Sequence, residues 1–187
     1  MRHLRSILCL IVAAVIAGCA TTKGDTPAEK RAAVQDMRRD VLSELYKIHP
    51  SAQGKIKDAP GYAVFSNANV NVIFASFGGG FGVAHDNKSS KDIYMKMGEA
   101  GIGLGLGVKD FRAVFVFNDR ATLDHFIASG WEFGGHADAA AKAGDKGAAV
   151  GGEALLDGVT IYQLTESGLA LQATVKGTKY WKDDDLN

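Results

Sequence analysis

After Pro60, the apolar side chains of this chain recur at every second residue, and this change of period constrains the fold more than any other feature. A two-residue period is that of a β-strand, in which successive side chains point to opposite faces. It predicts a short strand from Tyr62 to Ser66, followed by a turn at Asn67-Ala68-Asn69. The next stretch, Val70 to Phe77, is apolar on both faces, which predicts an interior strand.

Glycines divide the pattern that follows. Gly78 to Gly80 and Gly82 are predicted to interrupt the strand, and Asp86 to Ser90 is predicted to form an exposed loop. Alternation resumes from Asp92 to Gly98. Three apolar side chains fall on one side of this strand: Ile93, Met95 and Met97.

Every second residue from Gly101 to Gly107 is glycine, which predicts a strand with side chains on one face and bare backbone on the other. A strand face without side chains must be approached closely by another group. A helix or crossing strand of the same domain is favoured over a ligand for this role. A nucleotide site is not indicated, because no GxGxxG register is complete and no GK[ST] follows these glycines.

Two segments have helical spacing. The first runs from Ala28 to about Ile48, and its mixed charges favour packing on the domain over lying on lipid. Phe111 to Phe117 is predicted to be the most buried strand. A second helix follows near residues 120–129, with Asn118 or Asp119 as its N-cap and Gly130 at its end in the left-handed conformation.

The C-terminal part gives weaker local signals. Gly134 to Gly152 suits either a helix or a closely covered strand, whereas Val159 to Leu164 and Leu169 to Val175 predict a hairpin. Lys176 to Lys182 then leads to Asp183-Asp184-Asp185, which is predicted to be a solvated tail. The predicted fold is a single α+β domain. In this fold a strongly curved antiparallel sheet packs with the N-terminal helix and the helix near 120–129. The sequence does not decide whether the sheet closes into a barrel.

The N-terminal segment is typical of a secretion signal. Arg2 and Arg5 precede an apolar run of about eleven residues, roughly half of what a membrane-spanning helix needs. The run ends in Ile16-Ala17-Gly18-Cys19, which resembles the bacterial lipobox. That resemblance implies a diacylglyceryl group carrying fatty chains such as palmitate on Cys19. It divides the chain into a signal peptide (1–18), a tether (19–27) and a domain (28–187).

The same resemblance predicts where the protein resides. Ala20 is not the aspartate that marks retention in the inner membrane, so we expect an outer-membrane anchor with the domain facing the periplasm.

Cys9 leaves with the signal peptide and Cys19 is acylated, so no disulfide forms. Removal of Arg2 and Arg5 leaves 19 basic against 21 acidic side chains, which is not the basic excess of a nucleic-acid-binding protein.

Signals for catalysis are thin. No histidine pair has HxH or HxxxH spacing, no serine lies in GxSxG, and Glu99 is a lone carboxylate that we expect in water at a strand end. The sequence therefore predicts no enzyme, no metal, no cofactor and no small-molecule substrate. A pocket that gathered His85 or His136 with a carboxylate of displaced pKa would revive the enzyme hypothesis.

Several stretches of the β-rich region together resemble the SYLF domain, over about residues 55–177. They are Pro60 to Asn67, Phe77 to Gly82, Gly101 to Gly107, Ala113 to Asn118, Ser129 to Trp131, Ile161-Tyr162 and Ser167 to Leu169. The resemblance implies a lipid-binding module with no catalytic step, and an extended Gly134 to Gly152. The family's eukaryotic members bind phosphoinositide membranes, and some bind actin. This chain has no SH3 or FYVE domain, and in the periplasm it would meet neither actin nor, ordinarily, phosphoinositides.

Of the family's binding activities, we expect this chain to share only contact with anionic phospholipid head groups. The predicted contacts are cations in three clusters, one of which includes aromatic rings. They are Lys88, Lys91, Lys109, Arg112, Lys176, Lys179, Tyr180, Trp181 and Lys182. The main alternative is a scaffolding lipoprotein that recognises another envelope protein. A third, a small-ligand carrier, would need an apolar cavity beneath the glycine-rich strand.

Overall fold

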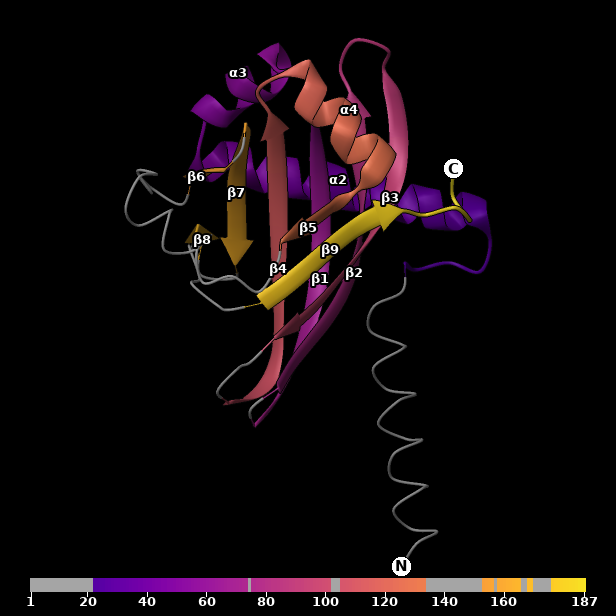
Figure 1. Ribbon diagram of the computed structural model, residues 1–187, viewed down its shortest axis with the longest axis vertical. Helices are drawn as coiled ribbons and strands as arrows, with labels where there is room; N and C mark the ends of the chain where they lie inside the picture. Colours follow the sequence, from indigo (N-terminus) through magenta and orange to yellow (C-terminus); the bar gives the residue numbers. More distant parts are fainter. Residues whose placement is uncertain are drawn as a thin grey trace, which may run out of the picture.

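The computed structural model describes residues 22–73, 75–101, 105–133, 153–156, 158–165, 168–169 and 176–187. These residues form three helices and nine strands (Figure 1). In chain order they are α2 (Pro27–Ile48), α3 (Ser51–Asp58), β1 (Gly61–Ile73), β2 (Ala75–Asp86), β3 (Lys91–Gly101), β4 (Gly105–Phe117), α4 (Arg120–Ser129), β5 (Trp131–Phe133), β6 (Glu153–Leu156), β7 (Val159–Thr165), β8 (Gly168–Leu169) and β9 (Lys176–Lys182).

The described strands form one antiparallel sheet in the order β5-β9-β3-β2-β1-β4-β7-β6, with β8 paired to β7. The sheet is open, because β5 and β6 end the order without pairing to each other. Its C-terminal strand, β9, lies between β5 and β3. The prediction of a single α+β domain with a curved antiparallel sheet is confirmed, and the barrel-like closure is not formed.

Helices cover both faces of the sheet (Figure 1). On one face, Val41 and Leu45 of α2 and Ile56 of α3 pack against strand residues that include Val64 and Val114. On the other, α4 packs against the alternate residues of the same strands. That second core contains mainly aromatic and aliphatic side chains: Ala63, Phe65, Ala84, Ile93, Met95, Met97, Ala113, Phe115, Phe117, Leu123, Phe126, Val159 and Tyr180.

Both predicted helices are confirmed. Thr26 and Glu29 form a capping box at the start of α2, and His49 closes its end by donating to the Leu45 carbonyl oxygen. Asp119 caps α4. Gly130 ends α4 with a positive φ of 71°, although its ψ of −164° lies outside the left-handed helical region. The helix α3 was not predicted.

The predicted turn at Asn67 to Asn69 and the break at the glycines of β2 are wrong. Residues 67–69 continue β1, and β2 runs through Gly78 to Gly82 in register with it. At Gly82 a Cβ would lie 2.3 Å from Cδ1 of Phe65, so this glycine makes room for a core ring rather than breaking the strand. The strands are long because each is paired on both sides.

The predicted glycine-rich strand is divided between two elements, since Gly101 ends β3 and Gly105 begins β4. Residues 102–104, the Gly134–Gly152 segment and most of the predicted strand Leu169–Val175 lie outside the described residues. The face on which the ligand-carrier alternative depends lies there too.

Asp86 ties α4 to the turn between β2 and β3. Its side chain accepts hydrogen bonds from Arg120 Nη1 (2.8 Å), Ser89 Oγ (2.8 Å) and the Lys88 amide (2.9 Å). The Arg120 guanidinium, followed by the Ser89 and backbone donors, holds the pKa of this nearly buried carboxyl well below its usual range.

Asp86→Asn is expected to lower the free energy of unfolding at pH 7 by about 2–3 kcal/mol, because it removes the charge that these donors stabilise. The folded-state pKa is depressed, so this contribution is present above the unfolded pKa of about 3.9 and is lost as pH falls below it. Urea unfolding at pH 7 and pH 3 checks this, and the difference from wild type should shrink at pH 3. Asp124→Asn is the control, since its exposed carboxyl shares Arg120 and should contribute under about 1 kcal/mol.

Candidate functional site

The first predicted cation cluster lies at the turn between β2 and β3. Lys88 and Lys91 are exposed there. Asn87 fixes the turn by donating to the carbonyl oxygens of Ile56 (2.7 Å) and Ala59 (2.8 Å) at the end of α3. The predicted exposed loop is confirmed for Lys88 to Ser90, whereas Asp86 ends β2 and is buried.

The second predicted cluster, Lys109 with Arg112, contains an ion pair. Arg112 Nη1 lies 2.6 Å from Oε2 of Glu44 on α2, so the pair leaves Arg112 less charge to offer an anionic head group. The backbone places Lys109 opposite Asn69 and Lys176 opposite Gly101. The side chains of these two lysines lie outside the described part of the structure.

The third predicted cluster is split by the alternation of β9. Tyr180 is 4% exposed and lies among core rings, with its centroid 4.7 Å from that of Phe65 and 5.2 Å from that of Phe115. Burial raises the pKa of Tyr180, and the Glu99 carboxylate raises it further. The prediction that Tyr180 contacts lipid is therefore wrong. Its neighbours Lys179, Trp181 and Lys182 are exposed.

Trp181 is held on the outside of the sheet by a glycine. It pairs with Lys96 on β3, and the nearby Gly98 gives the indole room, since a Cβ there would lie 3.3 Å from its Cη2. The side chain remains 38% exposed, one of two large hydrophobic side chains that the described surface exposes. The indole therefore lies close to the sheet at Gly98 and remains partly open to solvent.

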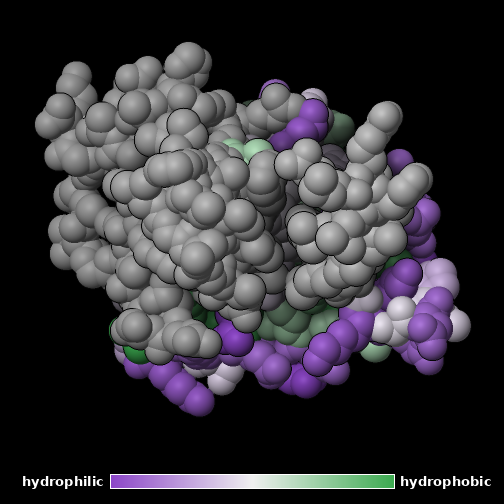
Figure 2. Space-filling view, turned by 90° about the horizontal axis from the view of Figure 1, so that it is seen from below, coloured by the Kyte–Doolittle hydropathy of each residue, from purple (hydrophilic) through white to green (hydrophobic). Residues whose placement is uncertain are grey.

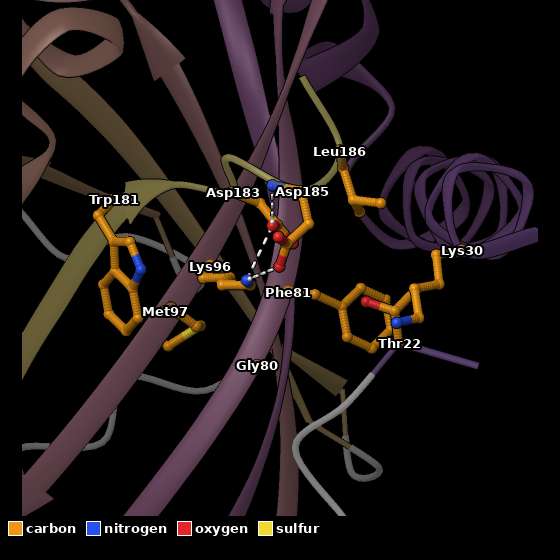
Figure 3. Close-up of a pocket in the computed structure, with 10 residues that line it drawn as sticks. All are labelled: Thr22, Lys30, Gly80, Phe81, Lys96, Met97, Trp181, Asp183, Asp185 and Leu186. Atoms are coloured by element: carbon orange, nitrogen blue, oxygen red, sulfur yellow. Dashed lines mark hydrogen bonds and ion pairs between the residues drawn. The ribbon is translucent and has the colours of Figure 1, made fainter. Parts of the chain in front are cut away.

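A pocket of about 410 Å³ lies beside Trp181 (Figure 3). Between its walls, Lys96 Nζ pairs with Asp183 Oδ1 at 2.8 Å and with Asp185 Oδ2 at 3.2 Å, and the hydrogen bond to Asp183 raises the pKa of Lys96. Its lining combines both charge signs with apolar side chains: Thr22, Lys30, Gly80, Phe81, Lys96, Met97, Trp181, Asp183, Asp185 and Leu186.

The C-terminal residues are fixed at this pocket. Asp183 donates its amide hydrogen to the Tyr94 carbonyl oxygen (3.0 Å), and Arg31 Nε donates to the Leu186 carbonyl oxygen (2.9 Å). Asp183 is buried, so the prediction of a solvated tail is wrong for it, whereas Asp184 and Asp185 are exposed. The first bond fixes the tail to β3, and the second fixes it to the start of α2.

Two buried polar side chains were not anticipated from the sequence. Glu99, which was expected in water, is 6% exposed. Asn67, which was expected in a turn, is 2% exposed, and neither of its side-chain polar atoms has a hydrogen-bond partner. A Cβ at Gly78 would lie 2.7 Å from Glu99 Cγ and 3.1 Å from Asn67 Oδ1, so the two side chains converge over this glycine.

Asp92 gathers donors from α2 and β2. Its Oδ1 lies 2.6 Å from His85 Nδ1 and accepts from Arg38 Nη1 (2.8 Å), while its Oδ2 accepts from Gln35 Nε2 (2.9 Å). A carboxylate engaged this way anchors α2 to the sheet. Among the described residues, no three His, Cys, Asp or Glu side chains are grouped to hold a metal ion. His136 and Cys19 lie outside those residues.

The described surface mixes charged and apolar areas. Seen from below, hydrophilic residues border a hydrophobic area (Figure 2). None of the described helices is long and apolar enough to span a bilayer.

Comparison with known proteins gives a family match and a relative. Residues 98–187 match the model of the family described as "Ysc84: Las17-binding protein actin regulator". Over these residues the chain is similar to the SYLF-domain family. It is also similar to Beta cell expansion factor A of Aeromonas veronii, with 37% identity over 161 residues, covering 86% of this chain and 60% of that relative. The chain thus spans about three fifths of the relative's length.

The family match and the relative confirm the resemblance to the SYLF domain that the glycine and aromatic motifs indicated. The family match begins at Gly98, near the end of β3, and includes β4, α4 and β9. It contains Trp181, Gly98 and the carboxylates of Asp183 and Asp185, whereas their partner Lys96 precedes it. The motifs quoted from Pro60 to Gly82 precede the matched range.

Proposed function

We propose that this protein is a non-enzymatic bacterial lipoprotein, anchored through Cys19, whose SYLF domain binds anionic phospholipid head groups at the periplasmic face of the outer membrane. The observation that carries the proposal is the exposure of Trp181 on β9, together with the exposed Lys179 on the same face and the exposed Lys182 at the end of the strand. Amphipathic rings among cations suit the membrane–water interface, where the ring and the charge both find partners. The family's association with lipid or actin partners supports a binding role.

The size of the effect follows from the charges. Each cation near an anionic surface contributes about 1 kcal/mol, so a few lysines give weak, salt-sensitive binding rather than stable attachment. A covalent lipid would therefore set localisation. The protein surface would set which lipids the domain meets.

The test uses a soluble version that begins at Ala20 and so carries no lipid. We expect it to sediment with phosphatidylglycerol liposomes at low salt, and to be released by salt. The double substitution Lys179→Gln with Lys182→Gln should lower the affinity for liposomes about 10- to 30-fold, because two cations that contribute about 1 kcal/mol each are lost. Lys47→Gln with Lys57→Gln removes the same charge from the ends of α2 and α3 and is the control. No sedimentation at low salt would refute lipid binding.

The second candidate is recognition of another envelope protein. It is favoured by the description of the matched family, which names a protein partner and actin regulation. A pull-down from envelope extract with the same soluble version separates the two. One partner retained in high salt, together with no liposome binding, would favour protein recognition.

A further inference from the structure

The N-terminal tether leaves the domain at the pocket beside Trp181. Thr22 lines this pocket, and Cys19 precedes it by three residues. Three residues span at most about 11 Å even when fully extended. A lipid on Cys19, which is part of the function proposed above, would therefore hold the pocket side of the domain close to the bilayer.

Trp181 lies on that same side. Figure 3 shows Trp181 and Thr22 on opposite walls of the pocket, with the Lys96 ion pairs between them. The other exposed large hydrophobic side chain of the described surface, Ile48, lies at the far end of α2. A 22-residue helix is about 33 Å long, so the tether places one of these two side chains near lipid and the other away from it.

The charges around the pocket also favour Trp181 as the group that contacts lipid. Lys96 is matched by Asp183 and Asp185, so the centre of the pocket has little attraction for phosphate. Exposed lysines lie in the segments next to the pocket: Lys23 follows Thr22 on the tether side, and Lys182 follows Trp181. The indole, which is 38% exposed, is thus the group best placed to enter the interface.

We propose that the domain turns its pocket side to the bilayer and seats Trp181 at the lipid–water boundary. Tryptophan favours this boundary because its ring is apolar and its N–H is polar. Lys91 is five residues from Lys96 along β3, about 17 Å, so the turn with Lys88 and Lys91 lies farther from the membrane than the tether reaches. The cluster on β9 then meets the lipid, and the cluster of Lys88 and Lys91 does not.

The chain's two tryptophans make this testable. The full chain, lipidated at Cys19, is reconstituted in vesicles that contain phospholipid brominated near the head group. Trp131→Phe leaves Trp181 as the sole tryptophan, which is excited selectively at the red edge of its absorption, and we expect its emission to be quenched and shifted to shorter wavelength. The control adds Trp181→Phe and Ile48→Trp, which moves the fluorophore to the far end of α2, where no quenching is expected.

If Trp131→Phe disturbs the core, the difference between wild type and Trp181→Phe gives the same signal. Quenching at position 48 equal to or above that at Trp181, or no quenching of vesicle-bound Trp181, overturns the orientation and leaves the lipoprotein proposal standing. An unlipidated Cys19 or a protein that does not stay with vesicles overturns the proposed function instead. The two failures are therefore distinct.

Discussion

Phe126→Ala is expected to lower the free energy of unfolding by about 3–5 kcal/mol, a large part of the 5–15 kcal/mol typical of a domain. Phe126 is 2% exposed and is the point at which α4 joins the sheet. Its ring centroid lies 5.0 Å from that of Phe117 and 6.1 Å from that of Tyr180. Truncation would leave a cavity that these rigid rings cannot fill. Urea unfolding of the soluble version measures the loss.

Ile127→Ala is the matched control, because Ile127 is the next residue on α4 but is only partly buried against the same core. It should cost about 1 kcal/mol. A loss for Phe126→Ala as small as that for Ile127→Ala would mean that α4 does not pack on the sheet as described. Since Tyr180 shares this core, the Phe126 variant should also loosen β9 and weaken liposome binding.

The helices were predictable because their signals are local. The capping residues Thr26 and Asp119, the prolines at either end of α2 and the spacing of Val41 and Leu45 all lie within the segment that they specify. The strand β3 was predictable for the same reason, since Ile93, Met95 and Met97 alternate with polar residues and all three are buried. The helix α3 has no comparable apolar stripe, with only Ala52 and Ile56 buried.

The lengths of β1 and β2 were not predictable from local rules. Asn67 and the glycines of β2 have turn-forming tendencies, but hydrogen bonding to strands on both sides overrides them. Whether Gly82 breaks a strand or admits a ring depends on Phe65, which is on the neighbouring strand. A single sequence does not reveal that neighbour.

The candidate site was found in part. Alternation along β9 was visible in Thr178, Lys179, Tyr180 and Trp181, and it could have separated the buried Tyr180 from the exposed Trp181. Lys176 to Lys182 is too short a segment, and too close to the acidic C-terminal residues, for its alternation alone to predict a strand. The partner that makes it a strand is β3, whose paired residues lie 75 to 87 positions earlier. Asp183 and Glu99 were misplaced in water for the same reason, because burial of a carboxylate depends on remote partners such as Lys96.

Cys19→Ser is expected to move the chain from the membrane fraction to the soluble fraction of cells that express it. Each buried methylene of a lipid chain contributes about 0.8 kcal/mol, and stable anchoring takes two chains or one chain with a basic patch. A diacylglyceryl group supplies two chains, whereas the serine hydroxyl cannot form the thioether that carries them. Fractionation followed by immunoblotting measures the shift.

Trp181→Phe is the matched control, because it changes the proposed interfacial contact and leaves the covalent lipid in place. It should remain in the membrane fraction, since the lysines and the indole together supply only a few kcal/mol. Mass spectrometry of the membrane-bound wild type should find a lipidated N-terminal Cys19 and no residues before it. An unmodified thiol there would contradict the anchor and with it the orientation of Trp181. Salt-sensitive liposome binding by the soluble domain would then have to account alone for any membrane association.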